Sequence, residues 1–286
     1  MGRAIEAVAG FATAPGATLT TVTASTGTSF TIRGTDTTKG TWLLGAWAFN
    51  ATAGELRITS PRLHDQVQGI RNRVTAALVA QLVGGPTNAG YTQRLYAQDN
   101  LTVQISGGGG AEKDSGILLI AYDDLAGVAG RFIDQPTLKK AGQNVVTAEV
   151  TVTGVATGNF GGAVAINSTN DNLIANTDYA ILGGMTDTRC GCVGIVGVDL
   201  GNLKLGFPGE PSLRAFSQNY FEQLSMAFNA PYIPVINSAN KSATNIDVQT
   251  SDTGGTFIIN LQLVQLAPGA VPSAVPPGAG GTQPGA

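Results

Sequence analysis

The segment WLLGAWAFNATAGELRITSPRLHD, residues 42–65, recurs in weaker form as YAILGGMTDTRCGCVGIVGVDLGN, residues 179–202. A repeat constrains the architecture more firmly than any single element, so it is the first feature to weigh. The matching positions are Leu44-Gly45 with Leu182-Gly183, Ile58 with Ile195, and Leu63 with Leu200. We therefore predict that the chain contains one β-rich folding unit twice.

The sequence that follows each copy also agrees in kind and in order. A helical pattern leads to a small-residue corner with a proline, then to a strand, and last to an apolar run introduced by glycine. These segments are residues 67–83, 84–86, 101–106 and 116–125 in the first copy, and 214–228, 229–231, 246–251 and 256–266 in the second. Pro86/Pro231, Leu101/Ile246 and Val103/Val248 share one offset. The offset differs from that of the early block, and the extra GFPGEP at 206–211 explains the change.

The composition indicates a strand-rich protein with an unusually uncharged surface. Of 286 residues only 12% are charged, against roughly 25% in a typical soluble domain. Free monomers usually carry many surface charges, which keep neighbouring molecules apart. A weakly charged exterior rich in Gly, Thr and Asn therefore favours a protein whose surface faces other subunits. The alternative is a compact secreted or thermally quiet β protein.

Several function classes are not expected from the charge and hydropathy patterns. The net charge is −3 and no basic run occurs, so non-specific nucleic-acid binding through phosphate neutralisation is not expected as the main function. Specific nucleic-acid binding is not expected either. No apolar stretch reaches the length of a membrane-spanning helix. The first 16 residues lack the hydrophobic core of a signal peptide.

Three segments, one at each end of the chain and one in the middle, are expected to lie outside the two folding units. Residues 1–14 place Ile5, Val8 and Phe11 near one helical face, and Pro15-Gly16 would end that helix. This segment would be a terminal arm laid on a neighbour or a lipid surface, or a frayed terminus. Residues 123–144 are charged and turn-rich, as expected of a connector with one helical turn. Residues 268–286 are rich in Pro, Gly and Ala and should be disordered or polyproline-like.

The interior elements follow from the period of the apolar residues. Residues 17–33 alternate and predict two strands joined at Thr26-Gly27, and residues 41–49 predict a strand in which Trp42 and Trp47 are core residues. Residues 66–83 predict a helix capped by Asp65, with Arg71 and Arg73 on its polar side. Residues 106–116 predict a loop tip. Residues 212–230 predict the helix of the second copy, with apolar residues at helical spacing: Leu213, Phe216, Tyr220, Leu224 and Phe228.

No set of residues predicts catalysis, a cofactor or a metal site. The one histidine, His64, has no G-x-S-x-G nucleophile elbow to work with, and a structural role in a turn is expected. Cys190 and Cys192 lack the further ligands of a zinc site and are predicted to be buried free thiols. The carboxylates Asp114, Asp123 and Asp124 are expected to be solvated rather than to bind a cation. We therefore predict that the protein is not an enzyme.

Two strand-rich copies, each with a helix before its last strands, in a weakly charged chain with a terminal tail resemble a known family. The chain is similar to the double jelly-roll major capsid proteins of icosahedral viruses, including smaller ones from bacterial viruses. The resemblance covers about residues 17–266. It implies an all-β fold of two jelly-roll β-sandwich or barrel units in tandem, each with one inserted α-helix. The implied divisions are an N-terminal arm 1–16, a first jelly roll 17–125, a connector 126–144, a second jelly roll 145–267 and a C-terminal tail 268–286.

The resemblance also implies a function and partners. The chain would be a structural virion protein, the major capsid protein, which self-assembles as homotrimers into pseudo-hexagonal capsomers of an icosahedral bacteriophage shell. Its partners would be other copies within the trimer and in neighbouring capsomers, and other virion proteins. The N-terminal arm would touch neighbours or an internal membrane, and the loop 106–116 would be a tower or inter-subunit loop. The protein would be made in the host cytoplasm and reside in the virion.

Two further classes stay open. The duplicated unit could belong to another phage particle protein, such as a decoration or tail subunit. A lectin-like carbohydrate-binding β-sandwich would need exposed aromatic residues, for which Tyr91, Tyr96 and Tyr232 are the candidates. A jelly-roll enzyme such as a cupin would need several His and carboxylate ligands, which one histidine does not supply.

Overall fold

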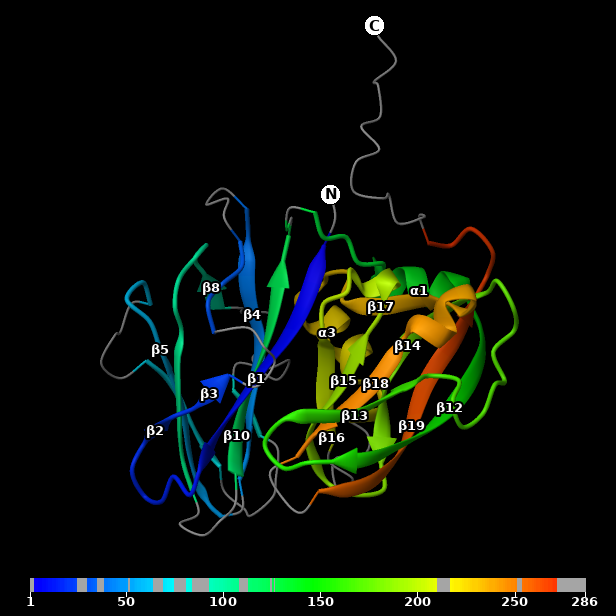
Figure 1. The fold of residues 1–286 in the computed structure, drawn as a ribbon. Helices are drawn as coiled ribbons and strands as arrows, with labels where there is room; N and C mark the ends of the chain where they lie inside the picture. Colours follow the sequence, from blue (N-terminus) through cyan, green and yellow to red (C-terminus); the bar gives the residue numbers. More distant parts are fainter. Residues whose placement is uncertain are drawn as a thin grey trace, which may run out of the picture.

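The computed structural model describes residues 3–24, 30–34, 39–50, 52–63, 69–74, 81–83, 93–107, 113–123, 125, 127–209, 217–250 and 254–271. This part of the chain is predominantly β and forms four antiparallel sheets. Two sheets come from each half of the chain, so the molecule consists of two packed β-sandwiches side by side (Figure 1). We call them the first unit and the second unit.

The first unit contains residues 4–122. Sheet A1 has the order β3-β1-β10-β4-β7, with β8 also paired to β4; sheet B1 has the order β2-β9-β5-β6. The strands of A1 are β1 (Ala4–Thr13), β3 (Thr23–Ala24), β4 (Thr41–Phe49), β7 (Gln81–Val83), β8 (Gln93–Leu95) and β10 (Lys113–Tyr122). The strands of B1 are β2 (Thr20–Thr21), β5 (Gly54–Thr59), β6 (Ile70–Val74) and β9 (Thr102–Ser106).

The second unit contains residues 132–266. Sheet A2 has the order β11-β17-β14-β19-β12, and sheet B2 has the order β13-β18-β15-β16. The strands of A2 are β11 (Phe132–Ile133), β12 (Gly142–Val155), β14 (Asp178–Thr186), β17 (Ile233–Asn237) and β19 (Gly255–Leu266). The strands of B2 are β13 (Phe160–Ala165), β15 (Cys190–Val196), β16 (Leu205–Gly209) and β18 (Asn245–Gln249). The described helices are α1 (Gln135–Ala141), α3 (Tyr220–Phe228), and the 3-10 turns η1 (Val198–Leu200) and η3 (Ser238–Ala243).

Both units use the same strand pairing. In the first unit β1 pairs with β10, β2 with β9, β4 with β7, and β5 with β6. In the second unit the corresponding pairs are β12 with β19, β13 with β18, β14 with β17, and β15 with β16. Two further pairings complete the two sheets of each unit: β10 with β4 and β9 with β5, matched by β19 with β14 and β18 with β15. The predicted repeat is therefore a repeated pairing scheme.

A β-bulge marks the same place in both copies. The register of β4 on β10 shifts so that Gly45 pairs with Leu119 while Leu43 pairs with Ile120, which leaves Leu44 without a partner. The register of β14 on β19 shifts in the same way around Leu182. A bulge inserts one extra residue into a strand and changes its local twist. The Leu-Gly pair that the sequence comparison matched is thus the same structural feature in each unit.

Sheet A1 is covered on both faces. In Figure 1 it lies between sheet B1 and the second unit. Along β1 and β10 the even-numbered residues, such as Val8 and Leu118, face the core of the first unit, and the odd-numbered residues, such as Ala7 and Leu119, join the core cluster of the second unit. Doubly covered strands read as continuous apolar runs instead of alternating ones.

The predicted N-terminal helix is wrong for this reason. Residues 4–13 form strand β1, which pairs with β10 along its whole length and is almost wholly buried. A continuous run of small apolar residues fits a helical period as well as a doubly buried strand, and periodicity alone does not separate the two. The segment is part of sheet A1 and not a terminal arm laid on a surface.

The predicted helix at 66–83 is also wrong in its described residues. Residues 70–74 are strand β6 and residues 81–83 are strand β7. Arg71 and Arg73 alternate with Ile70, Asn72 and Val74, and β6 pairs with β5 through all five positions. The second-copy helix is confirmed over residues 220–228, as α3. GFPGEP is not an insertion, because residues 205–209 are strand β16, the counterpart of β6.

The remaining expectations divide between confirmed, corrected and outside the described residues. Helix α1 confirms the helical turn in the connector; Asp134 caps it by accepting a hydrogen bond from the amide of Thr137 at 2.9 Å. Residues 17–33 form only the short strands β2 and β3 in their described part. Residues 113–116 of the expected loop belong to β10. Residues 108–112, 26–27 and 272–286 lie outside the described residues.

The C-terminal segment begins in contact with the second unit. Ala267 donates a backbone hydrogen bond to Ala141 at 2.8 Å, and Val271 is buried in a small apolar cluster with Leu138 of α1 and Leu266. Among the residues described, no helix is long and apolar enough to cross a membrane.

Candidate functional site

The two units contact each other through one sheet of each, and we call this contact the joint. It consists of the odd-numbered face of A1 against the face of B2 that points away from the second core. Ala7 of β1 donates its amide to the carbonyl of Lys204 at 2.6 Å, which places β1 directly against the start of β16. Ile5, Ala9, Ile117 and Leu119 are fully buried there.

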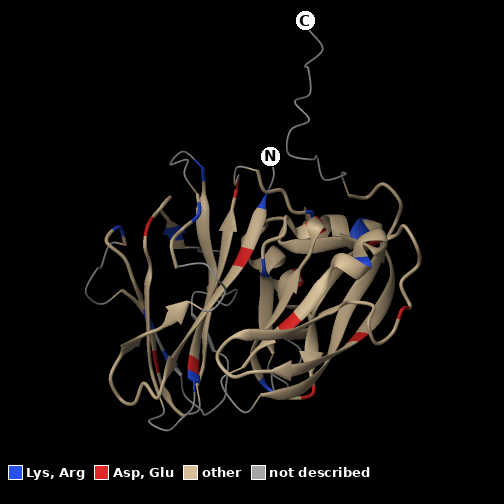
Figure 2. Cartoon of the chain, in the orientation of Figure 1, with Lys and Arg blue, Asp and Glu red and all other residues tan. Residues whose placement is uncertain are grey.

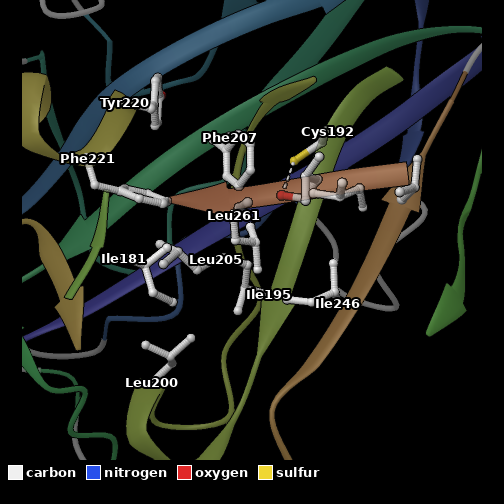
Figure 3. Packing of buried hydrophobic residues seen from close by; sticks show 14 of the residues in the cluster. Ile181, Cys192, Ile195, Leu200, Leu205, Phe207, Tyr220, Phe221, Ile246 and Leu261 are labelled. Carbon is white, nitrogen blue, oxygen red and sulfur yellow. Dashed lines mark hydrogen bonds between the residues drawn. The ribbon is translucent and has the colours of Figure 1, made fainter. Parts of the chain in front are cut away.

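Trp47 holds the joint from the first unit. Its indole Nε1 donates to the carbonyl of Gly191 in β15 at 2.7 Å, and its ring lies edge-to-face on Tyr220 with centroids 6.1 Å apart. Tyr220 in turn lies against Phe221, and Phe221 against Phe207. Figure 3 shows Phe207, Phe221 and Leu261 gathered in the second core. The prediction that Trp47 is a core residue is confirmed.

Small residues on B2 allow the two sheets to come close together. A Cβ atom on Gly206 would lie 3.0 Å from the Cβ atom of Ala7 and against the Sγ atom of Cys192. Cys190 and Cys192 are buried free thiols, as predicted. The thiol of Cys192 makes a weak hydrogen bond to the carbonyl of Val193 (Figure 3), and burial raises its pKa well above the usual value.

Polar groups are buried at the margin of the joint. Lys204 forms an ion pair with Asp247, and its Nζ atom lies 4.2 Å from the centre of the Phe160 ring. Burial raises the pKa of Asp247, although Lys204 opposes that shift. Deeper in the joint, the amide of Gln249 donates to the hydroxyl of Ser115, which joins β18 to β10. These groups tie the units together through contacts of defined geometry.

The connector is fastened to the second unit by Arg131. Its guanidinium donates to both carboxylate oxygens of Asp178, at 2.8 and 2.7 Å, and lies 3.6 Å from Asp199. Burial disfavours the charge on Asp178, but hydrogen bonds from Arg131 and Asn237 outweigh it and lower the pKa. Arg131 also donates its backbone amide to the carbonyl of Asp199 at 2.8 Å. This network fixes the position of the connector at the point where the chain passes from the first unit to the second.

A second ion pair joins the two ends of the first unit. Arg3 donates to Asp123 at 2.8 Å, and Nε1 of Trp42 donates to the other oxygen of the same carboxylate at 3.0 Å. The guanidinium of Arg3 lies 5.1 Å from the centre of the Tyr232 ring. Asp123 therefore has a structural role. The expectation that this carboxylate is only solvated is wrong.

The sequence-predicted candidates are not brought together. Tyr232 is only 4% exposed, whereas Tyr96 is 40% exposed, so these two do not form an aromatic sugar-binding surface. Asp114 is fully buried and is not a solvated carboxylate. His64, Asp124 and Tyr91 lie outside the described residues. Within the described ranges no group of His, Cys, Asp and Glu could hold a metal ion.

Two sheet faces remain on the outside of the molecule. The outer face of B1 carries three arginines opposite or diagonal to one another: Arg57 pairs with Arg71, and Glu55 pairs with Arg73. One end of the outer face of A2 is apolar and is covered by α1 and the segment that contains Val271. The uncovered part carries mostly uncharged polar residues around one carboxylate, Glu149. Its members are Val145, Thr147, Glu149, Thr151, Met185, Ile258, Asn260 and Gln262. Val145 is 70% and Ile258 39% exposed, which is unusual for residues of their kind. Figure 2 shows the charged residues at scattered positions in both units.

Sequence reasoning missed the residues that make the joint and the outer faces. The sequence alone places Gly206 in an apparent insertion, and Arg71 and Arg73 in a predicted helix. Arg131 and Glu149 had no local pattern that distinguishes them from ordinary surface charges. Ile70 and Val74 flank Arg71 and Arg73, but Asn72 between the two arginines interrupts the apolar alternation that is typical of a half-covered strand.

Comparisons with known proteins find no matching protein-family model and no matching curated protein. Among solved structures, the PBSX exported protein XepA is 12% identical with a TM-score of 0.26, covering 91% of this chain and 86% of that one. The major capsid protein P2 from bacteriophage PM2 is 6% identical with a TM-score of 0.22, covering 96% and 100%. The insecticidal delta-endotoxin Cry8Ea1 from Bacillus thuringiensis is 8% identical with a TM-score of 0.14, covering 93% and 53%. TM-scores this low do not establish a shared fold.

Proposed function

We propose that each unit is a jelly roll and that the chain is a structural virion protein, the major capsid protein of an icosahedral bacteriophage. Three copies assemble into a trimer whose two units per chain form a pseudo-hexagonal capsomer. The protein has no catalytic role and takes no cofactor. It is made in the host cytoplasm and functions in the virion.

The observation that carries the proposal is the repeated pairing scheme. A jelly roll is one long antiparallel hairpin rolled up so that its arms form two sheets and two Greek keys. In such a hairpin the first strand pairs with the last and the second with the last but one. The third strand pairs with the third from last, and the two middle strands pair with each other. The pairs β12·β19, β13·β18, β14·β17 and β15·β16 follow this scheme, and the first unit repeats it.

The geometry of the joint supports assembly. The two units meet through unlike faces, an A sheet of one and a B sheet of the other, so the contact is head-to-tail. Head-to-tail contacts leave one unused face of each kind and generate rings when the rotation closes. The outer face of B1 and the uncovered part of the outer face of A2 remain unused, and three chains would supply six units to a closed ring.

The partners in this proposal are other copies of the chain and other virion proteins. Specific nucleic-acid binding is not part of it. Contact of the N-terminal segment with an internal membrane is left out, because residues 4–13 are a buried strand.

The test is the mass of the purified protein in solution by light scattering, followed by electron microscopy of the same fraction. A trimer with a hexagonal outline, or closed shells, is the expected result. A protein that stays monomeric at high concentration would contradict the proposal. An elongated stack or an open fibre would instead favour a tail subunit of a phage particle.

A further inference from the structure

We propose that the outer face of A2 docks on the outer face of B1 of a second copy, and that Glu149 meets the arginines Arg71 and Arg73 in that contact. This inference rests on the proposed self-assembly and names the residues that would make it specific. The joint is the template for this contact, because it is the equivalent contact between the two units of a single chain.

Strand pairing makes the two units comparable residue by residue. The shared bulge sets Leu44 equivalent to Leu182, and hence Trp47 to Met185. Pairing across the sheets then extends the comparison. The row Ala7–Leu119–Gly45 corresponds to Thr147–Gln262–Gly183, and the row Ala9–Ile117–Trp47 corresponds to Glu149–Asn260–Met185.

The same procedure relates the B sheets. Ile58 pairs with Val103 and Ile195 pairs with Ile246, so these pairs occupy the same place. The row Arg57–Gln104–Arg71 then corresponds to Gly194–Asp247–Gly206. Gly54 corresponds to Gly191, so both units keep a glycine at this position.

The contacts of the joint can now be carried over to the outer faces. Inside the chain Ala7 lies against Gly206, and Trp47 reaches Gly191. The equivalent contact between copies sets Thr147 against Arg71 and Met185 against Gly54. Glu149 lies two residues beyond Thr147 on the same face, a distance of about 7 Å along a strand. That is within reach of an extended arginine side chain on β6.

Surface chemistry agrees with this arrangement. The outer face of B1 holds three arginines and one glutamate, while Glu149 is the charged group among the outer-face residues of A2 named above. Val145 and Ile258, which are exposed on A2, would lose water on docking. The joint uses apolar and small residues, but a contact between separately made copies needs charge to guide and orient it.

The experiment compares the self-association of four proteins by analytical ultracentrifugation: wild type, Glu149→Arg, Arg71→Glu and the double variant Glu149→Arg/Arg71→Glu. Each single variant is expected to weaken association by about tenfold or more, since like charges would then face each other. The double variant restores opposite charges and is expected to recover most of the loss. Higher salt should weaken the wild type and the double variant alike.

Both positions lie on outer faces, so each variant is expected to fold. Thermal unfolding of each variant checks this. Wild-type assembly that single charge reversals leave unchanged would overturn this inference while leaving the proposed function standing. Loss in the single variants without recovery in the double variant would also overturn the pairing of Glu149 with Arg71. A wild type that never associates would overturn both the inference and the proposed function.

Discussion

Sheets B1 and B2 share one strand order but carry different side chains at three matched positions on the face that points away from their cores. On B2 that face carries Cys192, Gly194 and Gly206 and is buried in the joint. On B1 the equivalent positions are Glu55, Arg57 and Arg71, and Arg71 is exposed. The same positions thus carry small residues where a second sheet covers them and long charged ones where none does.

The core-facing positions of the same strands behave in the opposite way. Leu56 and Ile58 of β5 correspond to Val193 and Ile195 of β15, and all four are buried and apolar. Because a strand alternates its side chains between two faces, one face can keep the fold while the other changes with its surroundings. The pairing scheme of this protein is therefore specified by half of its strand residues.

Removing Trp47 is expected to have the largest effect on stability. Trp47→Ala deletes a fully buried indole from the joint and leaves the Gly191 carbonyl without its donor. The expected loss in the free energy of unfolding is about 3–5 kcal/mol. The matched control is Met185→Ala at the equivalent outer position, with an expected loss below about 1 kcal/mol. Urea titration followed by tryptophan-independent circular dichroism measures both, and equal losses would contradict the assignment of the joint.

Filling the space at Gly206 is the next largest change. Gly206→Leu would push a side chain into Ala7 and Cys192 and force the sheets apart, at an expected cost of about 1–3 kcal/mol. The matched control Arg71→Leu places the same side chain on the exposed sheet and should cost less than Gly206→Leu, since it loses only a surface ion pair with Glu55. If both variants unfold at the same urea concentration, close approach of the sheets is not what selects glycine here.

The sequence contained the repeat but not its exact register. The match of Leu44 with Leu182 is correct, because both are bulge residues. The match of Val103 with Val248 is wrong: Val103 pairs with Ile58, whereas the partner of Ile195 is Ile246. A shift of two residues along a strand keeps every side chain on its own face, so an alternating pattern cannot detect it.

The candidate site was harder to predict than the fold. The joint depends on which sheet covers which, and strands β1 and β10 show this only as apolar residues on both faces. The same pattern in residues 1–14 led to a helix prediction. The arginine face arises because β6 pairs with β5, which brings Arg57 beside Arg71 across the sheet. Neither arginine carries a local signal of that neighbour.

Glu6 is the one charged residue on the core-facing side of β1, where the second unit has Val146 at the equivalent position. Burial raises the pKa of Glu6 above its ordinary value of 4.5, although Arg33 and the Tyr122 hydroxyl favour the charged form. The folded protein therefore keeps this proton to higher pH than the unfolded chain. The stability contributed by protonated Glu6 is complete below the ordinary value and is lost as pH rises through the raised pKa.

Glu6→Gln cannot ionise and should not show that loss. As pH rises from about 4 to about 7, we expect the free energy of unfolding of the variant to increase relative to that of the wild type. Urea titrations at several pH values measure the difference. Parallel curves for the two proteins would show that burial does not perturb Glu6, and a variant that loses ground on rising pH would reverse the sign of the argument.

The smallest expected effect is on the reactivity of the two thiols, which reports on the joint directly. Cys190 and Cys192 are buried on B2, and the pKa of Cys192 is raised by burial first and then by the nearby Cys190 thiol and Asp247 carboxylate. Since the thiolate is the reactive form, the native protein should react with a disulfide reagent at about pH 8 only at the rate at which the joint opens. Both thiols should react at once in denaturant. Gly206→Leu should accelerate the native reaction and Arg71→Leu should not, because only the first loosens the sheet that covers the cysteines. Fast labelling of the native wild type would place the thiols at an accessible surface and remove the physical reason for the difference between B1 and B2.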